Sequence, residues 1–358
     1  MSLLGVVMAG GGSRRFGSQK ALARLHGKPL WEIAADLLGT VTPDVVGVVN
    51  DASLADRIGL ECRPDVRPDH GPLAGVETAL GWARERNASG VIVLACDMPW
   101  VDRRVVEALV QAWVGGQILV PKSDGPWGFE PLSAVYPIQA LGPVGDALAL
   151  GRLELGAFVA AQSPLIVDVK GVGLDEFRSV NRPGDLPPPA VAVIGNKNSG
   201  KTTLAVGLIA ELAGRGREVM SAKHGHHFRL DAEGTDSWRH RHEGSAERVL
   251  LAGPEQFALM GAWGAGGEPS LDRLLAMHLG DAEIVVAEGF RTSRLPKVEI
   301  FRSKAQPEPI LDPAGARAAG ALATVTDQPD LPWSVPVFDP DAPDLIPRLT
   351  DLVERALL

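Results

Sequence analysis

Cysteine and long apolar runs are both scarce in this chain, and each scarcity excludes a class of protein. The two cysteines, Cys62 and Cys96, are too few for a disulfide framework and lie in no metal-ligand spacing. No stretch approaches the roughly 18 consecutive apolar residues that a membrane-spanning helix needs. The apolar start, 1–9, has no basic segment before it, so we interpret it as a strand and not as a signal peptide. We therefore expect a cytoplasmic protein without a membrane partner.

Positive charge is also in deficit. Lysine and arginine total 35 against 44 aspartate and glutamate residues, for a net charge of -9. A nucleic-acid-binding surface is normally basic, so this balance argues against nucleic acid as a partner. The chain is long, however, and 358 residues exceed what one hydrophobic core usually organises, which favours two domains.

The clearest domain boundary is a proline-rich segment at 182–189. Pro183 and the run from Pro187 to Pro189 fix the backbone φ angle and remove amide donors. This segment is therefore predicted to be neither helix nor central strand, and we place the two domains at 1–184 and 188–358.

Alternating apolar and helical stretches predict an α/β fold in both halves. Parallel strands buried on both faces are expected at 45–49, 91–96, 118–120, 190–194 and 284–287. Helices are expected at 31–38, 76–86, 103–113 and 202–215. This alternation predicts two tandem, doubly wound, three-layer α/β/α domains. Residues 303–345, rich in proline, alanine and aspartate, are expected to be largely irregular.

A loop of glycines and cations follows the first strand, with Gly10 to Gly12 preceding Arg14, Arg15 and Lys20. Glycines allow successive N–H groups to point at an anion. Arg15 stands where a Rossmann fingerprint requires glycine, and the Gly-Lys-Ser/Thr of a P-loop is missing here. The loop therefore suits a triphosphate whose pyrophosphate leaves. The alternative is a glycine-rich turn with solvated arginines.

The buried run 91–96 ends at Asp97, on the strand end that faces this first loop. A carboxylate in that position is suited to hold Mg²⁺ between phosphate oxygens. The alternative for an isolated aspartate of this kind is a helix N-cap or a turn residue.

Three motifs in register resemble the MobA family of molybdenum cofactor guanylyltransferases: MAGGGSRRFGSQKAL, RPDVRPDHGPLAGVETAL and LACDMP. The resemblance covers 3–182 and implies transfer of GMP from GTP onto molybdopterin, with release of pyrophosphate. It implies a nucleotide and Mg²⁺ site, with Asp97 as the metal ligand, made of Met8, Ala9, Gly10, Lys20, Asn50, Asp65 and Asp97. The attacking phosphate is already anionic, so alignment and neutralisation by Mg²⁺, Lys20 and Arg15 would suffice without a side-chain base. Met8 and Phe16 replace the usual leucine and methionine, which conserves size.

A second glycine loop matches Gly-x-x-x-x-Gly-Lys-Thr between the run 190–194 and an expected helix, the context that a P-loop requires. In it, Lys201 would reach the β- and γ-phosphates and Thr202 would ligate Mg²⁺. The run 284–287 ends at Glu288, where a Walker-B acid is expected; the alternative is a surface glutamate. The predicted second nucleotide site comprises Gly195, Asn198, Ser199, Gly200, Lys201, Thr202 and Thr203.

Five of the 8 histidines lie between His224 and His242. Histidine-rich tracts can bind zinc or nickel, although this tract contains neither cysteine nor a helical His-x-x-x-His pair. The P-loop, this tract, TDSWRHRHEGS and AEGF together resemble MobB, the GTP-binding partner of MobA, over 190–302. The resemblance implies that Asp236 lies in a mobile loop near the nucleotide.

Taken together, the motifs resemble a Rossmann-like MobA nucleotidyltransferase domain fused to a MobB-like P-loop NTPase domain. The alternative enzyme is a cytidylyl- or sugar-phosphate nucleotidyltransferase, which the pairing of Gly10-Gly11 with GPLAG at 71–75 disfavours. We expect the second domain to be a GTP-dependent adaptor and not a GTPase, because no arginine finger or catalytic glutamine is evident, although Arg239 and Arg241 are candidates. Molybdoenzymes or their chaperones are the further partners expected.

Overall fold

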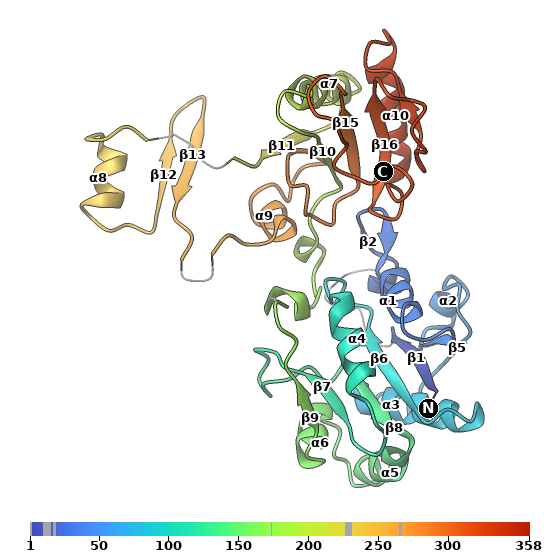
Figure 1. Cartoon of the computed structure of the whole chain (residues 1–358). Helices are drawn as coiled ribbons and strands as arrows, with labels where there is room; N and C mark the ends of the chain where they lie inside the picture. The colour runs from blue at the N-terminus through green and yellow to red at the C-terminus, as the bar shows by residue number, and fades with distance from the viewer. Residues whose placement is uncertain (1, 10–15, 17–18, 173, 226–230, 265–266) are drawn as a thin grey trace. The chain divides into compact units, whose positions relative to one another are not determined.

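The computed structural model describes every residue except 1, 10–15, 17–18, 173, 226–230 and 265–266 (Figure 1). The chain forms two compact units, Met1–Leu186 and Pro187–Leu358, hereafter the N-terminal and the C-terminal unit. A short 3-10 helix at Pro183–Asp185 shows that the expectation of no helix within 182–189 is wrong for those three residues. Proline is tolerated there because the N–H group at a helix start has no intrahelical partner. Across the described residues, no helix is both long and apolar enough to span a membrane.

The N-terminal unit is built on a mixed seven-stranded sheet with the order β5-β4-β1-β6-β8-β7-β9. Its strands are β1 (Leu3–Met8), β4 (Val45–Val48), β5 (Cys62–Arg63), β6 (Gly90–Ala95), β7 (Leu119–Pro121), β8 (Ser133–Pro137) and β9 (Leu165–Val167). β1 pairs in parallel with β4 and β6, whereas β8 runs antiparallel to both β6 and β7. The parallel pairing expected for 45–49 and 91–96 is confirmed, and β8, which was not predicted, adds antiparallel pairing to the sheet. All five residues of β8 are buried, so no polar alternation marks it in the sequence.

Helices cover both faces of this sheet (Figure 1). They are α1 (Leu30–Gly39), α2 (Ala52–Ala55), α3 (Pro72–Glu85), α4 (Arg103–Ala112), α5 (Leu141–Ala149) and α6 (Leu155–Ala161), with 3-10 helices at Lys20–Leu22, Ile138–Ala140 and Leu174–Phe177 and a small hairpin of β2 (Arg24–Leu25) and β3 (Lys28–Pro29). Trp82 of α3 and Phe158 of α6 belong to one buried cluster, while Leu38 of α1 and Leu109 of α4 belong to another. Alternate residues of β1 enter the two clusters, which therefore lie on opposite faces of the sheet. The predicted three-layer α/β/α architecture is confirmed.

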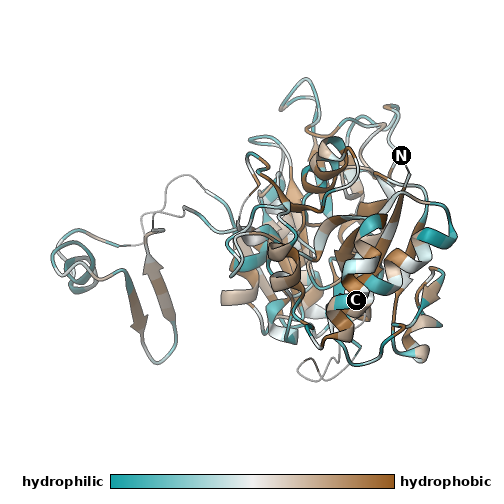
Figure 2. Cartoon of the chain, turned by 90° about the horizontal axis from the view of Figure 1, so that it is seen from below, coloured by the Kyte–Doolittle hydropathy of each residue, from teal (hydrophilic) through white to brown (hydrophobic). Residues whose placement is uncertain are grey.

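The C-terminal unit contains a fully parallel sheet of six strands in the order β11-β14-β10-β15-β16-β17. These are β10 (Ala190–Ile194), β11 (Val219–Lys223), β14 (Ile284–Glu288), β15 (Lys297–Phe301), β16 (Ala321–Thr326) and β17 (Val337–Phe338). α7 (Lys201–Gly214) and α10 (Leu345–Leu357) pack with strand residues in one buried cluster. α9 (Leu271–His278) packs in a second buried cluster with the strand residues that point to the other face of the sheet. Figure 2 shows the hydrophobic colours concentrated on the sheet strands. Residues 303–345 are largely irregular, as expected, apart from the short strands β16 and β17, which proline-rich neighbours conceal in the sequence.

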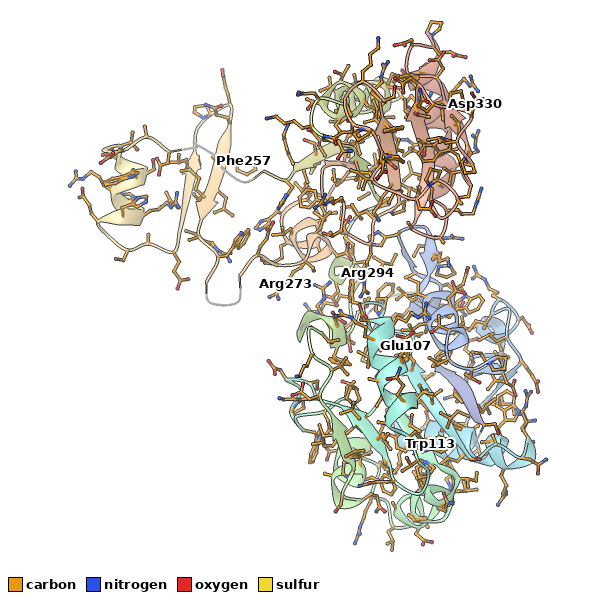
Figure 3. The ribbon with its side chains drawn as sticks, viewed as in Figure 1. Glu107, Trp113, Phe257, Arg273, Arg294 and Asp330 are labelled. Carbon is orange, nitrogen blue, oxygen red and sulfur yellow. The ribbon has the colours of Figure 1, made fainter. Side chains whose placement is uncertain are left out.

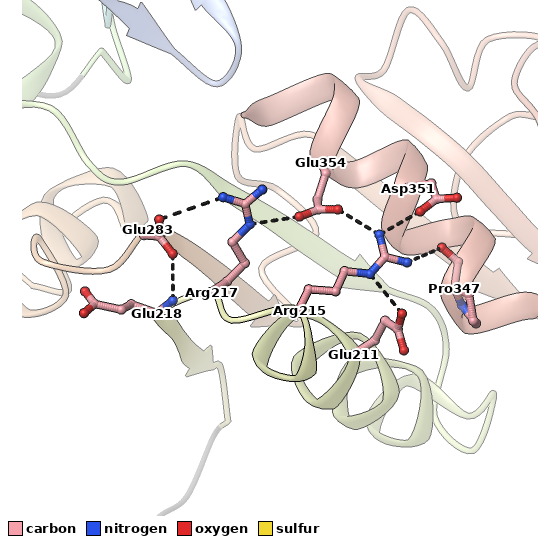
Figure 4. A network of polar contacts seen from close by, with 8 residues as sticks. All are labelled: Glu211, Arg215, Arg217, Glu218, Glu283, Pro347, Asp351 and Glu354. Atoms are coloured by element: carbon pink, nitrogen blue, oxygen red, sulfur yellow. Dashed lines mark hydrogen bonds and ion pairs between the residues drawn. The ribbon is translucent and has the colours of Figure 1, made fainter.

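An ion-pair network joins α10 to the end of α7 and the residues after it (Figure 4). Arg215 Nη1 lies 2.7 Å from Asp351 Oδ1 and 2.8 Å from Glu354 Oε2. Arg217 Nε lies 2.9 Å from the other oxygen, Glu354 Oε1. The Arg215 hydrogen bond lowers the pKa of the Glu354 carboxyl. Single exposed pairs contribute little, but a connected set orients the helix whose apolar face closes the core.

A small subdomain within 231–264 consists of α8 (Asp236–His242) beside a hairpin of β12 (Arg248–Ala252) and β13 (Phe257–Gly261). Phe257, labelled in Figure 3, is 78% exposed. The expectation that Asp236 lies in a loop is wrong, because it opens α8. Thr235 Oγ1 caps that helix by accepting a hydrogen bond from Trp238 N at 3.4 Å.

Candidate functional site

The carboxyl ends of β1 and β6 meet at one edge of the N-terminal sheet. β1 ends at Met8, and the next residue, Ala9, donates its N–H to Val48 O at 3.0 Å. Cys96 N donates to Met8 O at 3.1 Å, which brings the end of β6, and Asp97 after it, beside the end of β1. Ligands of open α/β sheets bind at this edge. Gly10 and Arg15 are also predicted to belong here, and both lie outside the described residues.

Lys20 and Asp97 form an ion pair at this edge, although they are 77 residues apart in sequence. Lys20 Nζ lies 2.7 Å from Asp97 Oδ2, and the two side chains are 19% and 23% exposed. Val180 N donates to Asp97 O at 2.7 Å, so the end of the unit returns to the same place. The Lys20–Asp97 pair is thus partly shielded from water, but both side chains keep enough exposed surface for a ligand to contact them. Such a ligand could replace the contact between the lysine and the carboxylate.

Glu130 is a residue of this edge that sequence reasoning missed. It precedes the antiparallel β8, and Ala95 N donates to Leu132 O at 2.9 Å, so the start of β8 lies beside the end of β6. Burial raises the pKa of the Glu130 carboxyl, the Leu132 N–H lowers it, and the charge of Asp97 raises it again. Only the direction of β8 places this carboxylate near Asp97, and no local motif announces it.

Asn50, after β4, and Asp65, after β5, are joined by two hydrogen bonds. Asn50 Nδ2 donates to Asp65 Oδ2, and Asp65 N donates to Asn50 Oδ1, each at 2.7 Å. Asp65 Oδ1 is buried and has no hydrogen-bond partner among the described residues. Burial raises the pKa of the Asp65 carboxyl against the lowering effect of Asn50. A Cβ atom at Gly75 would lie 3.4 Å from Asp65 Oδ1 and 2.2 Å from Met8 Cε, so glycine keeps this space open.

In the C-terminal unit, the segment between β10 and α7 has the backbone of a phosphate-binding loop. Gly195, Asn198 and Gly200 have φ angles of 155°, 65° and 99°, in the region that favours glycine. A Cβ atom at Gly195 would lie 2.5 Å from Ile300 O. Ser199 Oγ is buried without a hydrogen-bond partner in the part of the chain that the structure describes. The loop leads into the N-terminus of α7, where N–H groups lack intrahelical partners and attract anions.

The reactive side chains of this second site converge on Glu288 at the end of β14. Thr202 Oγ1 donates to Glu288 Oε1 at 2.8 Å, and Lys223 Nζ lies 3.1 Å from Glu288 Oε2. Lys201 Nζ donates to Asn196 O within the loop at 2.7 Å. Burial lowers the pKa of Lys201, Glu288 raises it, and Lys223 lowers it. Lys223 is a second residue that sequence reasoning missed, while Thr203 continues the first turn of α7.

The histidine tract is divided between different elements. His224 follows β11, with Nε2 3.6 Å from Glu268 Oε2, whereas His242 ends α8. His226 and His227 lie outside the described residues. Within those that are described, no group of three or more His, Cys, Asp or Glu residues is arranged to hold a metal ion.

Two family models match the chain in the order of its units. A MobA-like NTP transferase domain matches residues 5–165, and molybdopterin guanine dinucleotide synthesis protein B (MobB) matches residues 190–327. A probable molybdenum cofactor guanylyltransferase of Bacillus subtilis is 30% identical over 194 residues, 52% of this chain and 93% of that protein. A molybdopterin-guanine dinucleotide biosynthesis adapter protein of Haemophilus influenzae is 34% identical over 172 residues, 47% of this chain and 89% of that protein. The chain belongs to both families.

The family resemblance inferred from the motifs is thus confirmed. The N-terminal unit is a MobA-like nucleotidyltransferase, hereafter the MobA unit, and the C-terminal unit is a MobB domain, hereafter the MobB unit. Among solved structures, molybdopterin-guanine dinucleotide biosynthesis protein A from Archaeoglobus fulgidus is 28% identical. It covers 51% of this chain and 93% of its own, with a TM-score of 0.42. The MobA unit carries the Lys20–Asp97 pair, and the MobB unit carries the P-loop with Glu288.

Proposed function

We propose that the MobA unit transfers GMP from GTP onto molybdopterin, or its molybdenum-bound form, and releases pyrophosphate. The observation that carries this proposal is the 2.7 Å contact between Lys20 and Asp97 at the carboxyl edge of the sheet. A cation for phosphate and a carboxylate for a metal meet there, where nucleotides bind in open α/β sheets. The relatives named molybdenum cofactor guanylyltransferases support the choice of reaction.

We assign the guanosine to the space beside Asn50, Asp65 and Gly75, with Met8, Ala9 and Gly10 along the nucleotide. The unoccupied acceptor position of Asp65 Oδ1 suits a guanine N–H donor, because an ionised carboxylate only accepts hydrogen bonds. Cytosine presents fewer donors on its pairing edge, which favours GTP over CTP.

We assign the triphosphate to Lys20 and Arg15, both cations of the first loop segment. The attacking group is the terminal phosphate of molybdopterin, which is already anionic. The chain therefore has to align that phosphate with the α-phosphorus and neutralise charge, and it needs no side-chain base. Lys20 would leave Asp97 for the phosphates when GTP binds.

Asp97 is the proposed ligand of Mg²⁺ in this unit. The fit is supported by the Asp97 carboxylate oxygens at the strand end and by the half-buried carboxylate of Glu130. Burial raises the pKa of Glu130, and the charge of the nearby Asp97 raises it further. Oxygen ligands are those that Mg²⁺ prefers. When bound, Mg²⁺ supplies a charge that stabilises negative charge on the transferring phosphoryl group.

The test is product analysis with the full-length protein, Mg²⁺ and molybdenum-bound molybdopterin. We expect mass spectrometry to detect addition of one GMP with GTP, and pyrophosphate release with GTP but not with CTP. A CMP adduct would establish the cytidylyltransferase alternative. A product formed from a hexose 1-phosphate, and not from molybdopterin, would establish the sugar-phosphate alternative.

We further propose that the MobB unit binds a second GTP and acts as an adaptor toward molybdoenzymes or their chaperones. The site would be Gly195, Asn198, Ser199, Gly200, Lys201, Thr202 and Thr203, with Thr202 and Glu288 on Mg²⁺. Their oxygens already lie 2.8 Å apart, which fits a shared cation. Measuring GTP affinity beside GTP turnover separates an adaptor, with tight binding and negligible hydrolysis, from a GTPase. We place the functional modules at 1–184 and 188–358.

A further inference from the structure

A lysine at the end of β11 shares the acidic residue of the P-loop site. Lys223 ends β11, and in the register of the parallel pair it stands opposite Glu288, which ends β14. Lys223 Nζ lies 3.1 Å from Glu288 Oε2, while Thr202 Oγ1 donates to the other oxygen, Oε1, at 2.8 Å. The Glu288 carboxylate therefore bridges the first turn of α7 and the end of β11.

The backbone beneath Lys223 fixes where its side chain starts. His224 N donates to Glu288 O at 3.1 Å, and the ring centroids of His224 and Phe290 are 5.2 Å apart. Phe290 has a φ angle of 51°, a left-handed conformation that is costly for an aromatic residue and that gathers at functional sites. The ends of β11 and β14 are thus held together. The Lys223 side chain is 58% exposed, so it has room to change partner.

The charges around Glu288 change when a nucleotide and a metal bind. Glu288 raises the pKa of Lys201 and Lys223 lowers it, so the two ammonium groups lie near enough to repel each other. A dication between Thr202 and Glu288, as proposed above, would repel Lys223 more strongly. In P-loop sites Mg²⁺ bridges the β- and γ-phosphates, so the γ-phosphate lies beside this metal. A new anion is therefore expected next to Lys223 in the state in which Glu288 turns to the metal.

We propose that Lys223 determines the preference of the MobB unit for GTP over GDP, an inference that rests on the proposed GTP binding at this P-loop. Without nucleotide, the ammonium group neutralises Glu288. With GTP, Glu288 turns to Mg²⁺, and Lys223 uses its flexible four-carbon stem to donate to the γ-phosphate. With GDP that phosphate is missing, and the ammonium group competes with Mg²⁺ for Glu288. A GTP-dependent adaptor needs this distinction, because its partner has to recognise one nucleotide state.

The experiment compares the two nucleotides in a protein without this charge. Binding of GTP and of GDP at saturating Mg²⁺ is measured by calorimetry on the full-length protein as wild type, Lys223→Gln and Lys201→Ala. The Lys201→Ala protein isolates the MobB site, because the sites it retains are subtracted. We expect Lys223→Gln to weaken GTP about tenfold or more without weakening GDP, so the ratio of the two affinities falls by that factor. The Mg²⁺ concentration needed for half-maximal GDP binding should also fall, because the competing cation is gone.

The matched control is Lys304→Gln, which removes the same charge from an exposed lysine of the same unit. Lys304 follows β15, on the other side of β10 from β14. This variant should leave the ratio of GTP to GDP affinity unchanged, whereas a general effect of net charge would lower it as much as Lys223→Gln does.

The outcomes separate the two proposals. If wild type and Lys201→Ala bind GTP identically, the P-loop site itself is absent and both proposals fail. If the Lys201-dependent site exists but Lys223→Gln keeps the wild-type ratio, or weakens GTP and GDP equally, GTP binding stands and the role of Lys223 is wrong. An equal fall of the ratio in Lys304→Gln also overturns the assignment to Lys223.

Discussion

Replacing Asp65 by asparagine should stabilise the N-terminal unit and weaken its use of GTP. Asp65 Oδ1 is buried without a hydrogen-bond partner among the described residues, and burial raises the pKa of the carboxyl. A buried polar group left without a partner costs about 1–3 kcal/mol, and a charged group costs more. In the variant the asparagine oxygen still accepts from Asn50, and Nδ2 occupies the buried position of Oδ1. The substitution removes the cost of burying a charge, although a polar atom still occupies that position. We therefore expect a gain of about 1 kcal/mol, or about 2–4 °C in Tm for a domain of this size.

The gain should depend on pH with a definite sign. The unfolded carboxyl has a pKa near 3.9, and the folded one is higher because of burial. The folded protein thus binds this proton more tightly, and the charged form destabilises it. That cost is fully present above the folded pKa and disappears as the pH falls toward the unfolded value. The Asp65→Asn advantage should be largest near neutral pH and smallest near pH 4.

Asp51 provides the matched control, because it lies on the same edge and has the opposite shift. Its carboxylate accepts hydrogen bonds from Ser53, Gln19 and Leu54 N, which lower its pKa. Asp51→Asn should therefore destabilise the unit above the unfolded pKa, and the difference should vanish as the pH falls through the folded pKa. Calorimetric melting of both variants across this pH range, with GMP transfer assayed beside it, checks the reasoning. A lower Tm for Asp65→Asn at neutral pH, or a gain of equal size at every pH, would refute it.

The remaining predictions address the two nucleotide sites. Asp97→Asn should stay folded and lose GMP transfer by about a hundredfold or more, since the amide lacks the charge that holds Mg²⁺; wild-type transfer at saturating Mg²⁺ would contradict the metal assignment. Glu130→Gln should raise the Mg²⁺ concentration needed for half-maximal GMP transfer. An unchanged Mg²⁺ dependence would show that Glu130 does not contribute to the metal site. Lys201→Ala should weaken GTP binding about tenfold to a hundredfold in the MobB unit alone, so calorimetry should resolve two GTP sites in wild type and one in the variant. Residues 1–184 expressed alone should transfer GMP and 188–358 should bind GTP; an N-terminal half that folds and binds GTP without transferring GMP would show that the MobB unit supplies catalytic groups.

The sequence by itself determined the features whose chemistry is local. The P-loop is recognisable because its glycines, Lys201 and Thr202 lie within eight consecutive positions, Gly195 to Thr202, and its backbone must follow from that spacing. β10 was predicted with the bounds that the structure shows, because the prolines before the apolar run and the glycine after it limit where a strand can begin and end. Asp97 was singled out because a strand end is itself a local signal. The layered α/β architecture followed from alternating periodicities, which each segment carries alone.

The tertiary structure decided which distant residues meet. Glu130 comes to Asp97 only because β8 runs antiparallel, and apolar runs do not encode strand direction. Asn50 and Asp65 were each named from the resemblance to the MobA family, but their pairing and the buried Oδ1 of Asp65 depend on β4 and β5 lying side by side. β16 lies second from β10 in the C-terminal sheet, a position that no local pattern encodes, and the prolines around β16 and β17 obscured both strands in the sequence. Strand order is set by how whole faces pack against helices, a property of the folded sheet that no single segment carries.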